Sequence, residues 1–136
     1  MRALPFAALA LLACSDETAA RVLEAAAPFR QEHQRFVEWA TRTLDSEAGH
    51  PRSRPELEAI LFAPLALERS VLGAQIRRGD TVHAHGEPVP APLEWRTARE
   101  GAVVIEVAEL RVGTTPAIAL ATERGPYRVT TVHRRD

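Results

Sequence analysis

The clearest indication of the fold comes from residues Ala102–Arg134, AVVIEVAELRVGTTPAIALATERGPYRVTTVHR. This stretch contains three runs rich in apolar and β-branched residues, over Ala102–Glu109, Pro116–Thr122 and Tyr127–Arg134. Residues typical of turns separate them, and Glu123-Arg124-Gly125-Pro126 joins the last two. Runs of this length between glycine-containing turns are typical of antiparallel strands. The stretch therefore predicts a meander of strands.

Three more runs of the same kind come earlier, over Val71–Arg77, Thr81–His85 and Leu93–Ala98. Arg78-Gly79-Asp80 joins the first two, and Arg99-Glu100-Gly101 leads into the quoted stretch. Glycine in a short polar loop is typical of a hairpin turn. We therefore expect an antiparallel sheet of five or six strands over about residues 70–134.

The segment before the sheet has the periodicity of helices. Apolar positions recur at spacings of three and four residues along the face formed by Phe29, His33, Phe36, Ala40 and Leu44. This spacing predicts an amphipathic helix that ends near Gly49.

Two shorter helices are expected on either side of this one. Helix-forming residues begin at Thr18, and Pro28 should kink or restart the helix. Ser53-Arg54-Pro55-Glu56 has the spacing of a capping box, and Pro64 should end the helix that follows it. The prediction is an α+β fold in which N-terminal helices, over about residues 18–64, pack on the sheet.

Length and charge narrow the class of protein. A chain of 136 residues with 46% hydrophobic residues can bury the core of one domain. Its formal charge of −1 provides no basic excess for a nucleic-acid partner, and we expect none.

The N-terminal segment has the layout of a secretory signal. Arg2 precedes an apolar stretch, Ala3–Ala13, which is about half the length needed to span a bilayer. Leu11-Leu12-Ala13-Cys14 at its end resembles the lipobox of bacterial lipoproteins. The resemblance implies removal of residues 1–13, a mature domain over residues 14–136, and lipid on Cys14. The alternatives are a signal peptide without lipidation and a buried N-terminal helix.

Cys14 is the chain's only cysteine, so it has no partner for an intramolecular disulfide. In enterobacteria, Asp directly after the lipidated cysteine retains a lipoprotein at the inner membrane; this chain has Ser15 there. The resemblance therefore favours an outer-membrane anchor over an inner-membrane one.

The order of helices followed by a meandering sheet resembles extracytoplasmic PAS-like and Cache-like domains. The likeness is strongest over Ala74–Val82, which is similar to the first hairpin of such domains. Cystatin-like and nuclear-transport-factor-like folds share the same order of elements. The PAS-like resemblance implies a small ligand held by the sheet.

His83 and His85 are the candidate metal ligands, because alternate residues of a strand point to the same side. With a three-residue loop at Arg78-Gly79-Asp80, Ile76 would lie opposite Val82 and both histidines would face outward. A two-residue loop would instead place His83 opposite Ile76. Pairing the apolar side chains of Ile76 and Val82 across the hairpin favours the three-residue loop, in which both histidines face outward.

A metal site would still need a third ligand, for which His33, His50 and His133 are the possibilities. We therefore expect exposed strand histidines, no metal ion and no cofactor.

Other motifs have ordinary structural interpretations. Arg78-Gly79-Asp80 spells an adhesion tripeptide but suits a hairpin turn. Pro88-Val89-Pro90-Ala91-Pro92 could be a docking ligand, yet between two strands it suits a stiff connection. Trp39 and Trp95 could line a pocket, although core positions are commoner for such residues.

Catalytic signatures are scarce. Ser15, Ser46, Ser53 and Ser70 stand outside any Gly-flanked nucleophile turn. Glu106 and Glu109 could form a buried acid pair, but exposure at an edge is the commoner arrangement.

These observations order the possible functions. We expect a non-enzymatic envelope lipoprotein that contacts the membrane through Cys14 and binds another envelope protein. The alternative is a lipid-tethered PAS-like or Cache-like module that binds a small ligand. A metal-dependent enzyme using His83 and His85 is the third hypothesis. No ligand-binding residues are assigned by sequence.

Overall fold

The structure is a computed structural model that describes residues 17–90, 93–100 and 102–135. The predicted signal peptide, the lipobox and Cys14 lie outside these residues. Within the described part of the chain, no helix has the length and apolar character to cross a membrane.

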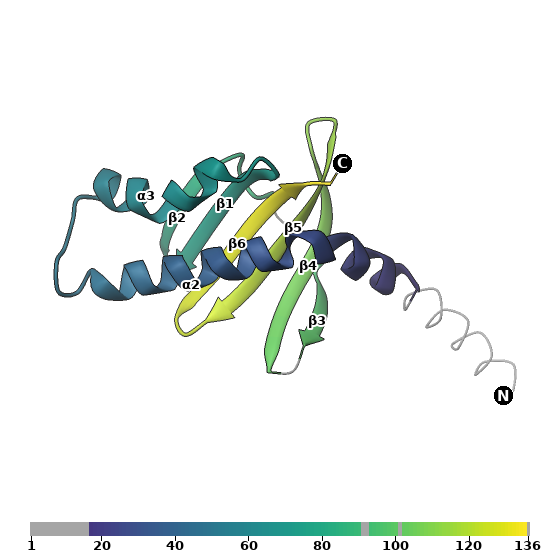
Figure 1. The fold of residues 1–136 in the computed structure, drawn as a ribbon, viewed down its shortest axis with the longest axis horizontal. Helices are drawn as coiled ribbons and strands as arrows, with labels where there is room; N and C mark the ends of the chain where they lie inside the picture. Colours follow the sequence, from purple (N-terminus) through teal and green to yellow (C-terminus); the bar gives the residue numbers. More distant parts are fainter. Residues whose placement is uncertain (1–16, 91–92, 101, 136) are drawn as a thin grey trace, which may run out of the picture.

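The helical part consists of one long, interrupted helix and a shorter one that returns beside it (Figure 1). Residues 17–26 are helical, the 3₁₀ helix η1 (Ala27–Phe29) contains Pro28, and α2 (Arg30–Ser46) continues in nearly the same direction. The α3 helix (Arg54–Phe62) leads into a second 3₁₀ helix, η2 (Ala63–Leu67). Pro28 therefore interrupts the helix as predicted.

Ser53 caps the start of α3. Its hydroxyl accepts the backbone N–H of Glu56 at 3.4 Å, which satisfies a donor that the first turn of a helix leaves unpaired. The Glu56 carboxylate accepts from the Ser53 hydroxyl at 2.9 Å, whereas the carboxylate of a capping box accepts from the backbone N–H of the capping residue.

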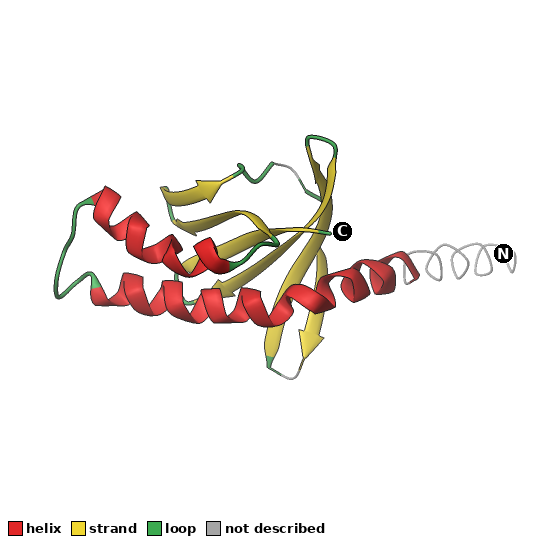
Figure 2. Ribbon diagram, turned by 45° about the horizontal axis from the view of Figure 1, so that its top comes forward, coloured by secondary structure: helices red, strands yellow, loops and turns green. Residues whose placement is uncertain are grey.

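Six antiparallel strands form a single sheet in the order β2-β1-β6-β5-β4-β3. Their bounds are β1 (Val71–Arg78), β2 (Thr81–Gly86), β3 (Arg96–Glu100), β4 (Val103–Val112), β5 (Thr115–Arg124) and β6 (Tyr127–Arg134). The helices cover one face of this sheet (Figure 2). The predicted α+β fold class is confirmed.

The sheet separates two apolar layers. On the helical face, Phe36 of α2 and Leu61 of α3 pack with Ile76 and Val129 of the sheet. A second cluster on this face joins residues 17–26 to β4 and β5, through Val22, Ala26, Ile105, Val107, Ile118 and Leu120. Each of these residues is at most 4% exposed.

The connection between β2 and β3 covers the opposite face of the sheet. It joins the two edge strands, and its Val89, Leu93 and Trp95 pack beside Ala119 and Val132. The described part of the proline run, Pro88–Pro90, belongs to this connection. Both faces of the sheet are therefore partly covered.

The register of the first hairpin corrects the sequence-based expectation. Arg78 pairs with Thr81, so the loop contains two residues, and Ile76 lies opposite His83. The first loop residue, Gly79, has φ of +57°, the sign required there by a two-residue type II′ turn. The prediction that both histidines face outward is wrong, because this register turns them towards the helices.

Candidate functional site

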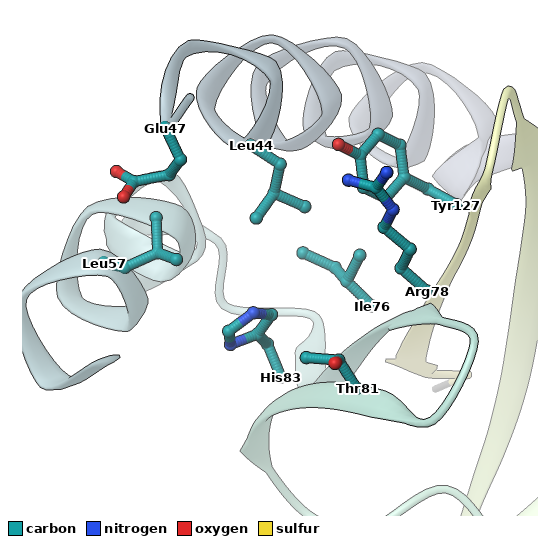
Figure 3. A pocket seen from close by; sticks show the side chains of 8 residues that line it. All are labelled: Leu44, Glu47, Leu57, Ile76, Arg78, Thr81, His83 and Tyr127. Atoms are coloured by element: carbon teal, nitrogen blue, oxygen red, sulfur yellow. The ribbon is translucent and has the colours of Figure 1, made fainter. Parts of the chain in front are cut away.

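A cleft of about 420 Å³ opens where the C-terminal end of α2 and α3 meet the β1–β2 hairpin (Figure 3). Its walls come from five elements, α2, α3, β1, β2 and β6, and from the turn after α2. The lining residues are Leu44, Glu47, Leu57, Ile76, Arg78, Thr81, His83 and Tyr127. A cleft of this size falls in the usual range for small-molecule sites, and its lining mixes aliphatic and polar side chains.

The inner part of the cleft is aliphatic. Leu44, Leu57 and Ile76 project into it from α2, α3 and β1 (Figure 3). Leu57 and Ile76 also belong to the core cluster, which fixes their positions, whereas Leu44 is only half-buried. The cleft therefore offers a rigid apolar surface that is open to solvent on one side.

His83 is a buried polar residue in the wall of the cleft. It is 9% exposed, and its Nδ1 lies 2.8 Å from Glu58 Oε2. Because a carboxylate accepts hydrogen bonds, the neutral imidazole donates from Nδ1 and keeps Nε2 as an acceptor. The ring points into the cleft (Figure 3). Glu58, which also lies 3.2 Å from Arg54 Nε, thus orients His83.

Arg78 and Tyr127 form the opposite rim. The guanidinium carbon of Arg78 lies 5.6 Å from the centre of the Tyr127 ring, and the Tyr127 hydroxyl donates to Asp45 Oδ1 at 3.0 Å. Burial raises the pKa of Tyr127, and the hydrogen bond to Asp45 raises it further. No carboxylate of the described residues lies within ion-pair distance of Arg78.

Glu47 contributes an acidic group to the rim that is already paired. Its Oε2 accepts the backbone N–H of Arg52 at 2.9 Å, and its Oε1 lies 3.2 Å from Arg52 Nη1. Glu47 and Arg52 therefore offset each other's charge beside the cleft.

A chain of buried polar side chains lies outside the cleft, between α2 and the middle of the sheet. Nδ1 of His33 is 2.7 Å from Thr131 Oγ1, and its Nε2 is 2.7 Å from Thr122 Oγ1. Thr131 Oγ1 is also 2.7 Å from Nε2 of His133. Both histidines are 0% exposed, and Phe29 stacks on His133 with ring centres 4.9 Å apart.

The contacts of His133, at one end of this row of side chains, fix the direction of the hydrogen bonds along it. Nδ1 of His133 lies 3.4 Å from Ser70 Oγ and 3.8 Å from Glu32 Oε2, while Ser70 donates to Glu32 at 3.0 Å. His133 therefore donates from Nδ1 and accepts from Thr131 at Nε2.

The same direction continues to the other end. Thr131 accepts from Nδ1 of His33, whose Nε2 accepts from Thr122. Every ring nitrogen is satisfied while both imidazoles are neutral. Burial lowers the pKa of His33 to about 3, with a smaller contribution from the charge of His133, and burial lowers the pKa of His133 to about 4.

The candidate metal ligands do not converge. His83 is bonded to Glu58, and His85 stacks on Phe62 with ring centres 5.3 Å apart. The suggested third ligands lie elsewhere, since His33 and His133 belong to the buried chain and His50 is exposed after α2. The described residues contain no group of three or more side chains arranged to hold a metal ion.

Glu106 and Glu109 lie on opposite faces of β4, because they are an odd number of residues apart on one strand. Glu106 lies 2.6 Å from Arg128 Nη1, and Glu109 pairs with Arg135. The acid pair considered from the sequence therefore does not form.

The two tryptophans have structural contacts away from the cleft. Trp39 Nε1 donates to the carbonyl of Ile60 at 3.1 Å, which ties α2 to α3. Trp95 lies under the Arg128 guanidinium, 5.1 Å from ring centre to Cζ.

Sequence reasoning missed three residues of the cleft region. Arg78 was considered only as part of a turn, and Tyr127 only as a strand residue. The missed signal for Tyr127 is alternation, which places it on the same face as Val129. Glu58 has no local signal for its role, because its contact with His83 spans 25 positions in sequence.

The chain was compared with known protein families, curated proteins and solved structures. No family model, curated protein or solved structure matches the chain.

Proposed function

We propose that this chain is a lipid-anchored envelope protein whose domain is a non-enzymatic module for binding a small ligand. The cleft between α2, α3 and the β1–β2 hairpin is the binding site. The observation that carries the proposal is the combination of an aliphatic wall with a histidine whose orientation Glu58 fixes.

The anchor rests on Leu11-Leu12-Ala13-Cys14 and on the absence of a second cysteine. The first described helical residue, Glu17, is three positions after Cys14, so a lipid there would hold the domain close to its membrane. Ser15 after the cysteine favours the outer membrane.

The cleft favours ligand binding over the adaptor function expected first. An adaptor would dock through an exposed apolar face or along an exposed edge strand. Among the described residues, the large hydrophobic side chains that are clearly exposed are Leu67 on η2 and Val103 and Val104 on β4. They do not make up such a face, whereas the cleft has both an apolar wall and directional polar groups.

Blocking the cleft tests the binding site. The probes are 3-phenylpropan-1-ol and 3-phenylpropionate, added to the full chain in mild detergent while its melting temperature is followed. Leu44→Trp should fill the cleft and abolish the upward shift that a probe produces. Ala59→Trp is the matched control, since it places the same side chain on an exposed position of α3.

The two variants separate the outcomes. A shift that survives in Leu44→Trp, or no shift with either probe in the parent chain, would contradict the proposed site. A stoichiometric protein partner captured from solubilised envelope by Leu44→Trp as well as by the parent chain would favour the adaptor function instead.

Replacing the cysteine tests the anchor separately. Cys14→Ala should abolish incorporation of radiolabelled palmitate in the producing bacterium, because no other cysteine can be acylated. Ser15→Ala serves as the control and should be labelled like the parent chain. Continued labelling of Cys14→Ala would show that the N-terminal segment is not a lipoprotein signal.

A further inference from the structure

We infer that the ligand of the cleft is a small amphipathic carboxylate, whose anionic group binds Arg78 and whose apolar body lies on Leu44, Leu57 and Ile76. This inference rests on the proposed function and specifies the class of ligand.

The distribution of charge around the cleft is the first argument. Three carboxylates near its rim have partners: Glu47 is paired with Arg52, Glu58 with Arg54 and His83, and Asp45 accepts from Tyr127. Asp80, in the loop between Arg78 and Thr81, is exposed. Arg78 contacts the face of the Tyr127 ring instead of a carboxylate. The cation at the rim is thus available to an anion, and its planar guanidinium suits a carboxylate.

The hairpin register is the second argument. Arg78 is directly opposite Thr81, and both residues line the cleft. The Thr81 hydroxyl can donate to the same carboxylate that the guanidinium binds. On the same face of the hairpin, the next pair towards the core is Ile76 and His83. Diagonal neighbours on one face of two paired strands are roughly 7–8 Å apart. The charged end of the hairpin is therefore followed at once by an apolar wall.

The polar acceptor in that wall restricts the other end of the ligand. When the imidazole of His83 is neutral and its Nδ1 donates to Glu58, Nε2 carries a lone pair, which disfavours a carboxylate beside it. The anion consequently belongs at the Arg78 end. His83 can accept a hydrogen bond from a hydroxyl or amide on the body of the ligand.

The volume limits the size of the ligand. A closed cavity of about 150 Å³ holds the six carbon atoms of benzene, so at the same volume per atom a cleft of about 420 Å³ suits a molecule of up to roughly 17 non-hydrogen atoms. Aryl-alkyl and medium-chain carboxylates have this size.

Three matched probes test the assignment by titration calorimetry on the full chain in mild detergent, with detergent alone as the blank. They are 3-phenylpropionate, 3-phenylpropan-1-ol and 3-phenylpropylamine, which share one apolar body. The carboxylate should bind about tenfold more tightly than the alcohol, and the amine should bind least.

Substitution of the arginine should remove this preference. Arg78→Gln should weaken binding of 3-phenylpropionate about tenfold and leave the alcohol within about twofold, whereas Arg78→Lys should retain most of the preference. Arg77→Gln is the matched control, because it removes the same charge from the neighbouring residue on the other face of β1.

The outcomes distinguish the two proposals. Equal affinity for carboxylate and alcohol, both abolished by Leu44→Trp, would overturn the carboxylate assignment and keep the cleft as a binding site. The assignment would also be overturned if Arg77→Gln matched the effect of Arg78→Gln. If no probe binds in a way that Leu44→Trp prevents, the proposed function itself fails.

Discussion

Acidification should destabilise the domain through His33 and His133. In an unfolded chain both imidazoles titrate near 6.5, whereas in the folded protein the pKa of His33 is about 3 and that of His133 is about 4. Because the folded-state pKa values are lowered, the unfolded chain binds protons first as the pH falls. Stability is therefore full above about pH 6.5 and is lost from there towards about pH 3–4.

The size of the effect follows from proton linkage. A group protonated in the unfolded chain and neutral in the folded one changes the free energy of unfolding by about 1.4 kcal/mol per pH unit. Between about pH 5.5 and 4.5 both histidines meet this condition, so together they should remove about 3 kcal/mol. That is a large part of the 5–15 kcal/mol typical of a domain.

Urea unfolding of the full chain, followed by circular dichroism at about pH 7.5, 5.5 and 4.5, measures this dependence. His33→Gln keeps a neutral polar side chain and should roughly halve the slope between the two lower values. His50→Gln removes an exposed histidine and should leave the slope unchanged. A parent slope equal to that of His33→Gln would refute the argument, since His33 would then titrate alike in both states.

Three further outcomes are expected. Gly86→Ala should strongly lower the free energy of unfolding measured in urea, because Gly86 has φ of +71° and a Cβ there would collide with the backbone of β1. Gly113→Ala is the control: Gly113 has φ of +64° but open space around it, so its substitution should lower that free energy by only about 1 kcal/mol. Absorbance titration of Tyr127, the sole tyrosine, should give a midpoint above the ordinary value near 10. Asp45→Asn should lower that midpoint, and an unchanged midpoint would place Asp45 away from Tyr127. Phe36→Ala should cost about 3–5 kcal/mol, and a loss under about 1 kcal/mol would mean that its 2% exposed ring is not in the core.

The elements of this fold could be read from the sequence because their signals are local. The spacing of Phe36 and Ala40 marks the buried face of α2, and Ser53 and Glu56 mark the start of α3. Each signal depends on residues within one or two turns of helix. The runs of β-branched residues likewise located all six strands to within a few positions.

The site could not be read in the same way because its contacts join distant segments. The loop between β1 and β2 is one residue shorter than expected, and this register places His83 in the cleft instead of on the outer face. The hydrogen bond that accommodates His83 there comes from Glu58 on α3. Apolar matching of Ile76 with Val82 was a local criterion, so it could not include that partner. The buried hydrogen bonds of His33 also join distant segments, since His33 and Thr131 are 98 positions apart.

The central place of β6 has a consequence for the order of assembly. This strand lies between β1 and β5. The hairpin over residues 71–86 and the three-stranded meander over residues 96–124 therefore cannot join into one sheet until residues 127–134 are added. A chain that crosses a membrane from its N-terminus would therefore complete translocation of nearly the whole domain before its sheet could close. Until then, β1 and β5 would each expose the edge that pairs with β6 in the folded protein.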